Sequence, residues 1–344
     1  MEVSELAAQT PQPTAVPFAA LALHLPEPIP VPQQWEVEID NAKYHWYDLI
    51  AGFPQVPDIR DPVGRYLRRM QFELEAAAAN RHIYFVVTRP RIRFDTARQT
   101  QWGFFSLKLT LPLLVGADEL REAITIELKV PFAATVKKPT VTMTENFITL
   151  NWGGMVEALS VHDVLQHYEN GLKIPGKVIY VGQTLDPAAR LSRGRLTELQ
   201  KLHQQHSEHQ DTLLLVQQMR VTAHSELGDP VTWPAYQSDE AADLLRRDRM
   251  DVVEAALIRY FEGAAPRARH TEDKSERQER LRAIAADERL EQVSITLELP
   301  DAGNYRYLMS DQVAAARQHL LDCSLADGEA LVTRREPPPR NVRA

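Results

Sequence analysis

The chain has 344 residues, 44% of them hydrophobic and 25% charged, which is ordinary for a globular protein and long enough for two domains of about 150 residues each. Its single cysteine, Cys323, excludes intrachain disulfides and multi-thiolate zinc sites, and we expect a cytoplasmic protein. Thirty-nine Lys and Arg against 47 Asp and Glu give a net charge of −8, the wrong sign for a protein that coats nucleic acid nonspecifically.

Residues 1–32 predict an extended, proline-rich arm. Seven prolines in this stretch block both helix and sheet. The apolar run 15–25 is interrupted by Pro17 and falls far short of the roughly 20 residues that a bilayer span needs. We therefore expect no membrane anchor and no membrane partner.

Residues 33–150 predict an antiparallel β-rich domain with one packed helix. Strands are expected where β-branched and aromatic residues gather or alternate with period two, over 35–39, 82–88, 104–111, 123–130 and 147–151. The helix is expected to begin after Asp61, an N-cap followed by Pro62, and to end at Ala79. Because no segment here has the spacing of a catalytic motif, we expect this domain to select a substrate or a protein partner.

Residues 151–324 predict a second, smaller α/β domain, which makes the fold class α+β. The expected helices cover 160–168, 186–209, 239–262 and 272–290, with a last one from Ser310 that contains Val313, Leu320 and Leu321. The expected strands cover 178–182, 213–221 and 293–299. Residues 325–344 hold three consecutive prolines among arginines and are expected to form a disordered tail.

The segment 178–191 concentrates groups that suit phosphate binding. It places Tyr180 on a strand, Gly182 where a backbone or a phosphate can approach closely, and Arg190 at a helix start, where anions are favoured. The alternative is an ordinary buried strand followed by a capped helix with a surface arginine.

Basic residues surround this segment in the chain. They are Lys177, Arg193, Arg195 and Lys201. These side chains fit contacts to a nucleic-acid backbone, and they fit an exposed charged helix face equally well.

Glu254 is expected on the inward face of the helix over 239–262. Apolar residues stand four positions before it and three, four and seven positions after it. An inward carboxylate is costly unless it is paired or binds a cation. The two open readings are a salt bridge to an arginine, such as Arg190, and a divalent metal ion.

The segment 178–191 resembles the core of the GIY-YIG nuclease superfamily and is most similar to the UvrC-type nuclease domain of bacterial excision repair. Tyr180-Val181-Gly182 matches the YIG half-motif, and Arg190 matches the catalytic arginine of the family. The resemblance covers at most residues 147–269. It implies that Glu254 binds Mg²⁺ or Mn²⁺, that Tyr180 takes a proton from water, and that DNA, double- or single-stranded, is the substrate.

The sequence departs from the family pattern at three places. No Gly-Ile-Tyr directly precedes the strand of Tyr180, so either Tyr168 or the strand over 147–151 stands for the first half-motif. Gly194 occupies the place of a His or Tyr one helical turn after the arginine, and the asparagine beyond Glu254 is missing.

Three hypotheses follow from these patterns. The first is a metal-dependent DNA endonuclease that serves phage defence, restriction, mobile-element processing or repair. The second is a catalytically inactive GIY-YIG-like module for nucleic-acid binding or assembly. The third is an unrelated α/β domain in a structural protein.

Overall fold

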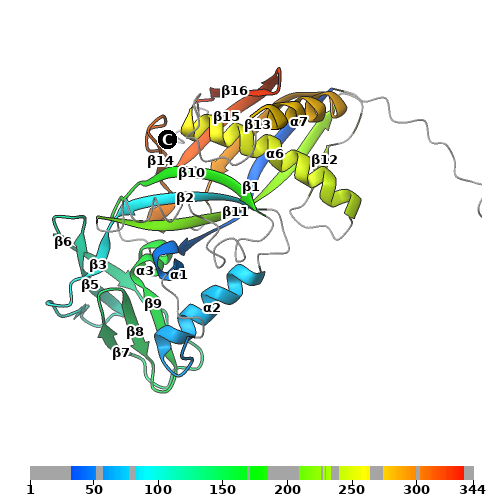
Figure 1. Ribbon diagram of the computed structural model, residues 1–344. Helices are drawn as coiled ribbons and strands as arrows, with labels where there is room; N and C mark the ends of the chain where they lie inside the picture. The colour runs from blue at the N-terminus through cyan, green and yellow to red at the C-terminus, as the bar shows by residue number, and fades with distance from the viewer. Residues whose placement is uncertain are drawn as a thin grey trace, which may run out of the picture.

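The computed structural model describes residues 32–51, 57–76, 82–168, 171–184, 209–225, 228, 230–233, 240–263, 274–299 and 303–336. These residues form a mixed, strand-rich α+β fold with a curled main sheet, in agreement with the expected fold class. Figure 1 shows a large sheet, with long helices packed on it, above a smaller lobe of short sheets.

The main sheet has nine strands in the order β14-β10-β2-β11-β1-β13-β15-β16, with β12 paired to β11. The strands are β1 (Gln33–Trp46), β2 (His82–Pro90), β10 (Gly176–Thr184), β11 (Gln210–Ser225), β12 (Val231–Trp233), β13 (Leu290–Glu298), β14 (Leu308–Met309), β15 (Gln318–Ala326) and β16 (Glu329–Arg334). The pairs β1–β13 and β10–β14 are parallel, and the others are antiparallel.

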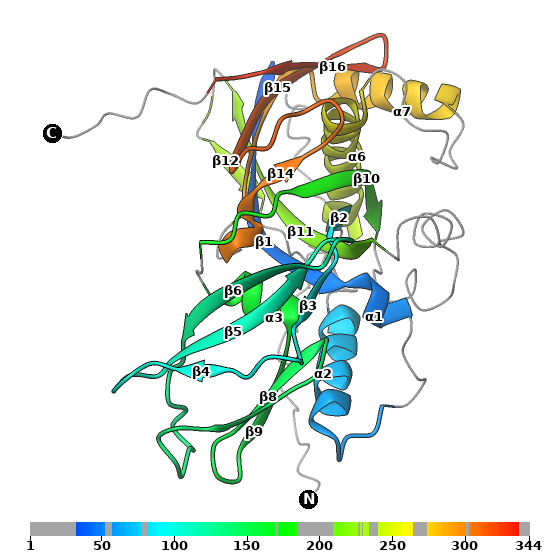
Figure 2. The same cartoon turned by 90° about the vertical axis from the view of Figure 1, so that its left-hand side faces the viewer.

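The smaller lobe lies between β2 and β10 in the chain. One of its sheets holds β3 (Ile92–Phe94), β4 (Gln101–Trp102), β5 (Lys108–Val115) and β6 (Leu120–Glu127). The other holds β7 (Thr140–Met143), β8 (Phe147–Asn151) and β9 (Val156–Ser160). Helix α2 (Pro62–Ala76) packs beside β8 and β9 through Tyr66 and Met70 (Figure 2).

The remaining helices are α1 (Tyr47–Ala51), α3 (Val161–His167), α6 (Glu240–Glu262), α7 (Lys274–Asp287) and the 3₁₀ turn η3 (Gly303–Arg306). Helix α6 packs its apolar side on the main sheet, where Phe261 meets Phe85 of β2 with ring centroids 5.2 Å apart. None of the helices in the described part of the chain combines the length and apolar character that crossing a bilayer requires.

Several expected elements are present. The Asp61 side chain accepts a hydrogen bond from the Gly64 backbone N–H at 3.1 Å and caps α2, as its place before Pro62 predicts. Helix α6 spans almost the expected range, and its charged successor is α7. The strand expected over 104–111 begins only at Lys108, because residues 103–107 form the turn from β4.

The helix expected from Ser310 is wrong. The Ser310 hydroxyl accepts the backbone N–H groups of Gln312 and Val313, each at 3.1 Å, as a helix cap would, but the chain turns back to a bridge between Leu308 and Ala316. Leu320 and Leu321 lie instead in β15, which pairs with β13, and both side chains are buried. The expected tail from residue 325 is also shorter than predicted, because residues 329–334 form β16 against β15.

The expected division near residue 150 does not separate two sheets. Strands β1 and β2 precede that point, and both lie inside the main sheet between strands that follow it. The point itself falls on the β8–β9 pair of the smaller lobe. One large core therefore receives side chains from both halves of the chain.

Candidate functional site

The strand β10 carries the sequence motif and lies near one edge of the main sheet. Its outer neighbour β14 pairs only with Gly176 and Lys177. Beyond them the edge meets α6, where the Val181 N–H donates to Glu262 Oε1 at 3.1 Å and the Gln183 N–H donates to Glu254 Oε1 at 3.0 Å. Two carboxylates of one helix thus accept two N–H groups that none of the described strands pairs.

Tyr180 has a second tyrosine beside it. Its ring stacks on that of Tyr84 from β2, with centroids 5.8 Å apart and planes 30° apart. Gly182 pairs with Tyr84 across the two strands. A Cβ at Gly182 would lie 2.7 Å from Cε1 of Tyr180 and 2.8 Å from the Tyr84 hydroxyl oxygen, so only glycine fits between the two rings.

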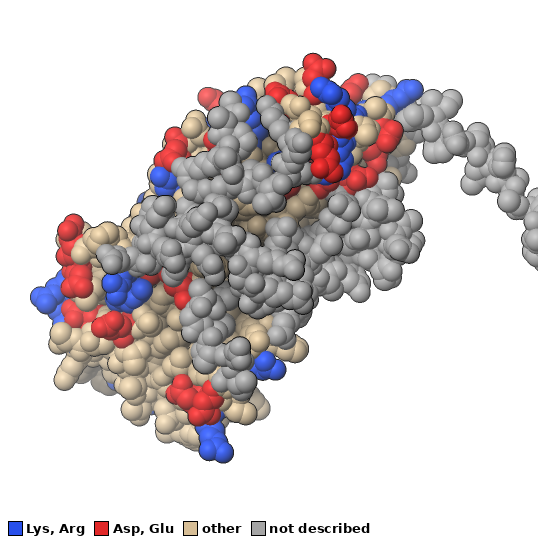
Figure 3. All heavy atoms as spheres, viewed as in Figure 1, with Lys and Arg blue, Asp and Glu red and all other residues tan. Residues whose placement is uncertain are grey.

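Glu254 belongs to a cluster of compensated charges between α6, α7 and β10. Arg277 Nη2 lies 3.6 Å from Glu254 Oε2, and Arg280 Nε lies 2.7 Å from Asp251 Oδ2. The Gln183 side-chain amide donates to Asp251. The expected inward position of Glu254 is confirmed, since only 13% of its side chain is exposed. Figure 3 shows acidic and basic side chains intermingled where α6 and α7 reach the surface.

The ion pair of Arg277 with Glu254 is loose. A separation of 3.6 Å is too long for a hydrogen bond, and Arg277 Nη2 has no hydrogen-bond partner among the described residues. Arg280 Nε lies closer to its carboxylate, 2.7 Å from Asp251 Oδ2, but this ion pair also lacks hydrogen-bond geometry. Of these two ion pairs between α6 and α7, the one that involves Glu254 is the longer.

The tyrosine pair and α6 approach β10 from different directions. Tyr84 and Tyr180 pack with Ile179, Leu214 and other residues of a small cluster, whereas Val181 packs in the main core with α6. Glu254 contacts the edge of β10 at the backbone N–H of Gln183, three positions after Tyr180. The structure thus gathers Tyr180, Gly182 and Glu254 around one short stretch of β10.

Other expected site residues lie elsewhere. Lys177 forms an ion pair with Asp311 at 2.6 Å near the start of β10. Tyr168 ends α3 and lines a different cavity. Four expected residues, Arg190, Arg193, Arg195 and Lys201, fall outside the described residues, as does the helix expected over 186–209.

Tyr84 is the residue that the sequence reasoning missed. Neither Tyr168 nor the strand over 147–151 lies beside β10, since that strand is β8 and pairs with β7 and β9. The strand that pairs with β10 is β2, and it carries His82-Ile83-Tyr84. The Ile-Tyr pair was the available signal, but the whole smaller lobe separates it from Tyr180 in the chain.

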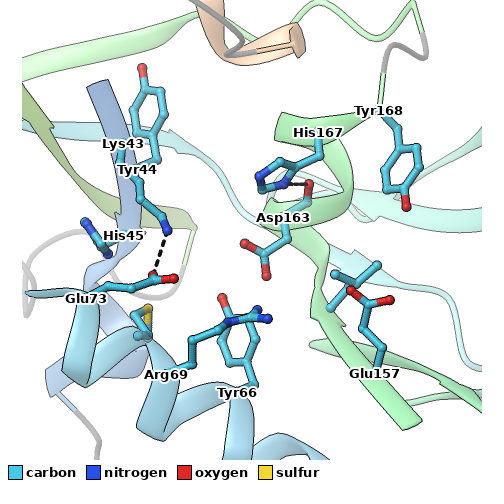
Figure 4. A pocket seen from close by; sticks show the side chains of 12 residues that line it. Lys43, Tyr44, His45, Tyr66, Arg69, Glu73, Glu157, Asp163, His167 and Tyr168 are labelled. Carbon is cyan, nitrogen blue, oxygen red and sulfur yellow. Dashed lines mark hydrogen bonds and ion pairs between the residues drawn. The ribbon is translucent and has the colours of Figure 1, made fainter. Parts of the chain in front are cut away.

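The cavity that contains Tyr168 has a volume of about 390 Å³ and lies between β1, α2, β9 and α3 (Figure 4). Its charged groups are mixed: Lys43 pairs with Glu73 at 2.6 Å on one side, and Glu157 lies below Tyr168 on the other. Burial, followed by the charge of Glu157, raises the pKa of Tyr168. His45 Nδ1 has no hydrogen-bond partner among the described residues, and burial lowers the pKa of this histidine to about 3.

A second polar group of residues is buried in the core. Asp211 receives hydrogen bonds from Arg93 Nη1 at 2.7 Å and from the Ile92 N–H at 2.8 Å, and His162 Nε2 lies 3.1 Å away. Burial acts to raise the pKa of Asp211, but His162, Arg93 and the Ile92 N–H together lower it below the usual value. Because Asp211 and Tyr305, the other partner of His162, are fully buried, we assign this network to fold stability.

Among the residues that the structure describes, no three His, Cys, Asp or Glu side chains gather as a metal-binding group. No protein-family model, curated protein or solved structure matches the chain.

Proposed function

We propose that the chain is a metal-dependent DNA endonuclease of the GIY-YIG type. The observation that carries the proposal is the Tyr84–Tyr180 pair, held face to face on adjacent strands over Gly182. With Ile83-Tyr84 in place of the first half-motif, both tyrosines of the family pattern stand side by side. Glu254, at the edge of the same strand, is the third member of the site.

Each residue has a distinct role in this proposal. Tyr180, as the phenolate, accepts a proton from the attacking water, and Tyr84 holds the Tyr180 ring in place by stacking. The positive charge of Arg190 favours the phenolate form. Arg190 follows β10 by a few residues and stabilises the negative charge that develops on the phosphate oxygens. The smaller lobe, inserted between the two tyrosine strands, selects the substrate or a protein partner.

Glu254 is the residue that would hold the metal ion. Mg²⁺ keeps most of its water ligands and commonly binds through one or two carboxylates, so a single glutamate meets its needs. Arg277 Nη2 lies 3.6 Å from Glu254 Oε2, so a cationic group already stands beside the carboxylate that would hold the metal ion. Bound there, Mg²⁺ or Mn²⁺ supplies positive charge to the phosphate and lowers the pKa of a bound water.

The test is cleavage of plasmid and of single-stranded DNA with Mg²⁺ or Mn²⁺. We expect Tyr180→Phe, Arg190→Ala and Glu254→Gln each to lower the cleavage rate by about 100-fold or more, the usual cost of losing an acid–base or electrostatic group. Glu262→Gln is the matched control, because Glu262 accepts the N–H of Val181 as Glu254 accepts that of Gln183. Equal rates for Glu254→Gln and Glu262→Gln would contradict the proposal.

One observation favours a second function, an inactive module of the same type that binds nucleic acid or another protein. Arg277 already neutralises Glu254, as it would in a domain that has lost its metal. The Arg277→Ala variant separates the two functions. In an active nuclease it lowers the Mg²⁺ concentration for half-maximal cleavage, whereas an inactive module binds DNA without cutting it in either form.

A further inference from the structure

Two loops of the smaller lobe meet at one end of its four-stranded sheet. The turn from β4 to β5 covers residues 103–107, and the connection from β6 to β7 begins at residue 128. The Leu128 N–H donates to the Leu107 carbonyl at 3.0 Å, which places the two loops side by side. In Figure 2 the β4–β5 hairpin projects to the left, clear of the rest of the lobe.

Three phenylalanines on these loops, which we call the phenylalanine tip, are almost fully exposed. Phe104, Phe105 and Phe132 have 89%, 99% and 107% of their reference surface in contact with solvent. The rings of Phe104 and Phe105 meet edge to face, 4.6 Å apart. Phe105 has a φ of 56°, a left-handed conformation that is unfavourable for a bulky residue, so the turn holds the ring outward at an energetic cost.

The phenylalanine tip stands on a packed base. Leu109 and Leu128 directly behind the loops are buried in the core. Trp102 is half-buried, and Lys138 Nζ lies 4.5 Å above its ring. The exposed phenylalanines therefore stand on packed residues of the lobe, and Lys138 lies over the Trp102 ring.

The charge of the two loops is opposite to that of the whole chain. Residues 102–108 and 128–138 contain four lysines and no aspartate or glutamate, while the chain carries a net charge of −8. All four lysines, Lys108, Lys129, Lys137 and Lys138, are exposed. The two loops thus combine exposed phenylalanines with an excess of lysines, and the adjacent acidic residue, Glu127, pairs across the sheet with Lys108.

We propose that the phenylalanine tip docks the protein on the surface of an anionic membrane. Apolar rings that project from a convex surface can enter the boundary between headgroups and acyl chains, while lysines around them attract anionic lipids. Single-stranded nucleic acid fits this surface less well, because stacking of successive bases needs a groove that follows the backbone, whereas Phe104 and Phe105 stand on a projecting turn. The proposal replaces the expected absence of a membrane partner and is independent of the nuclease assignment.

Vesicle flotation with the full chain tests the proposal. We expect at least about tenfold more protein on vesicles with roughly 30% phosphatidylserine than on pure phosphatidylcholine, and a clear loss in high salt. The triple variant F104S/F105S/F132S should lose about tenfold or more of this binding. Phe72→Ser is the matched control, because Phe72 is 64% exposed on α2, away from the two loops.

Three outcomes would overturn membrane docking. The first is equal binding to both kinds of vesicle, or binding that the triple variant retains. The second is concentration-dependent self-association without vesicles that the triple variant abolishes, which would make the phenylalanine tip an interface between copies. The third is loss of single-stranded DNA binding in the triple variant with vesicle binding unchanged. Because the substituted residues are exposed, an unchanged melting temperature of the variant shows that it still folds.

Discussion

Gly182 is the residue on which the geometry of the tyrosine pair depends. A methyl group there would meet Tyr180 and Tyr84 at less than 3.0 Å, and both rings belong to a packed cluster. We expect Gly182→Ala to lower the free energy of unfolding in urea by about 1–3 kcal/mol, the usual cost of overpacking, and to lower any nuclease activity.

Gly228→Ala is the control for this prediction. Its Cβ would lie 3.5 Å from the nearest atom, Ser225 Oγ, which is ordinary contact. A Gly182→Ala variant as stable as Gly228→Ala would show that the two rings move apart easily, and the close approach would then have no structural importance.

The sequence predicted single residues well where local pattern decides their place. Glu254 was expected on the inward side of its helix from the spacing of its apolar neighbours, and it is mostly buried. Tyr84 could not be found in the same way. The strand of Tyr84 is apolar on both faces, so alternation does not indicate which face carries a functional side chain. Its partner strand, β10, is separated from it in the chain by the whole smaller lobe.

At the scale of elements, α6 takes the place of a neighbouring strand along the edge of β10. Glu262 and Glu254 accept the N–H groups of Val181 and Gln183, which otherwise would need water or another strand. Hydrogen bonds to a charged acceptor contribute about 1.5–3 kcal/mol each. The contact between helix and strand therefore depends on two acidic side chains as well as on apolar packing.

We predict that Glu262→Ala speeds amide hydrogen exchange at Val181 by about tenfold or more, as expected when a hydrogen bond of this kind is lost. Gln183 should keep its protection, because its acceptor is Glu254. Glu254→Ala should give the reverse pattern. Exchange that rises equally at both residues in either variant would mean that the edge opens as one unit.

Elements with strong local signals were predicted correctly, and those that depend on distant pairing were not. Asp61-Pro62 marked the start of α2, and the long periodic segment marked α6. Ser310 has the local chemistry of a helix cap and uses it, yet the apolar residues after it pair with β13. Pairing in a sheet is a tertiary interaction and therefore overrides the helical pattern of a short segment.

At the scale of the whole molecule, two buried histidines predict sensitivity to mild acid. Burial, followed by the charge of Lys43, lowers the pKa of His45 to about 3, and burial lowers that of His319 to about 4. An unfolded chain takes up these protons at a pKa of about 6.5, whereas the folded protein does not. Protons therefore favour the unfolded state throughout the interval between the folded and unfolded values.

We expect the free energy of unfolding to fall as pH drops from about 6.5 to 4, by up to about 1.4 kcal/mol per pH unit for each histidine. Urea titrations at several pH values measure this slope. The double variant H45Q/H319Q should have a shallower slope, whatever its stability at neutral pH. Asp211 does not enter this interval, because its lowered pKa places its contribution below about pH 4. Identical slopes for wild type and variant would contradict the prediction.

Sheet topology was the feature least accessible from the sequence. A change of residue pattern near 150 suggested two domains, but each half of the chain supplies strands to the same sheet. Composition and periodicity reflect the local environment of each segment, and they do not indicate which strands are neighbours in a sheet. The interleaving of β1, β2, β10 and β11 became visible only in three dimensions.

The position of β1 in this sheet has a consequence for biosynthesis. This early strand is flanked by β11 and β13, and β13 ends only at Glu298. The ribosome synthesises β1 long before β11 and β13. During most of translation, β1 therefore lacks its neighbouring strands and exposes its apolar side chains. We therefore expect the nascent chain to recruit chaperones until β13 has been synthesised.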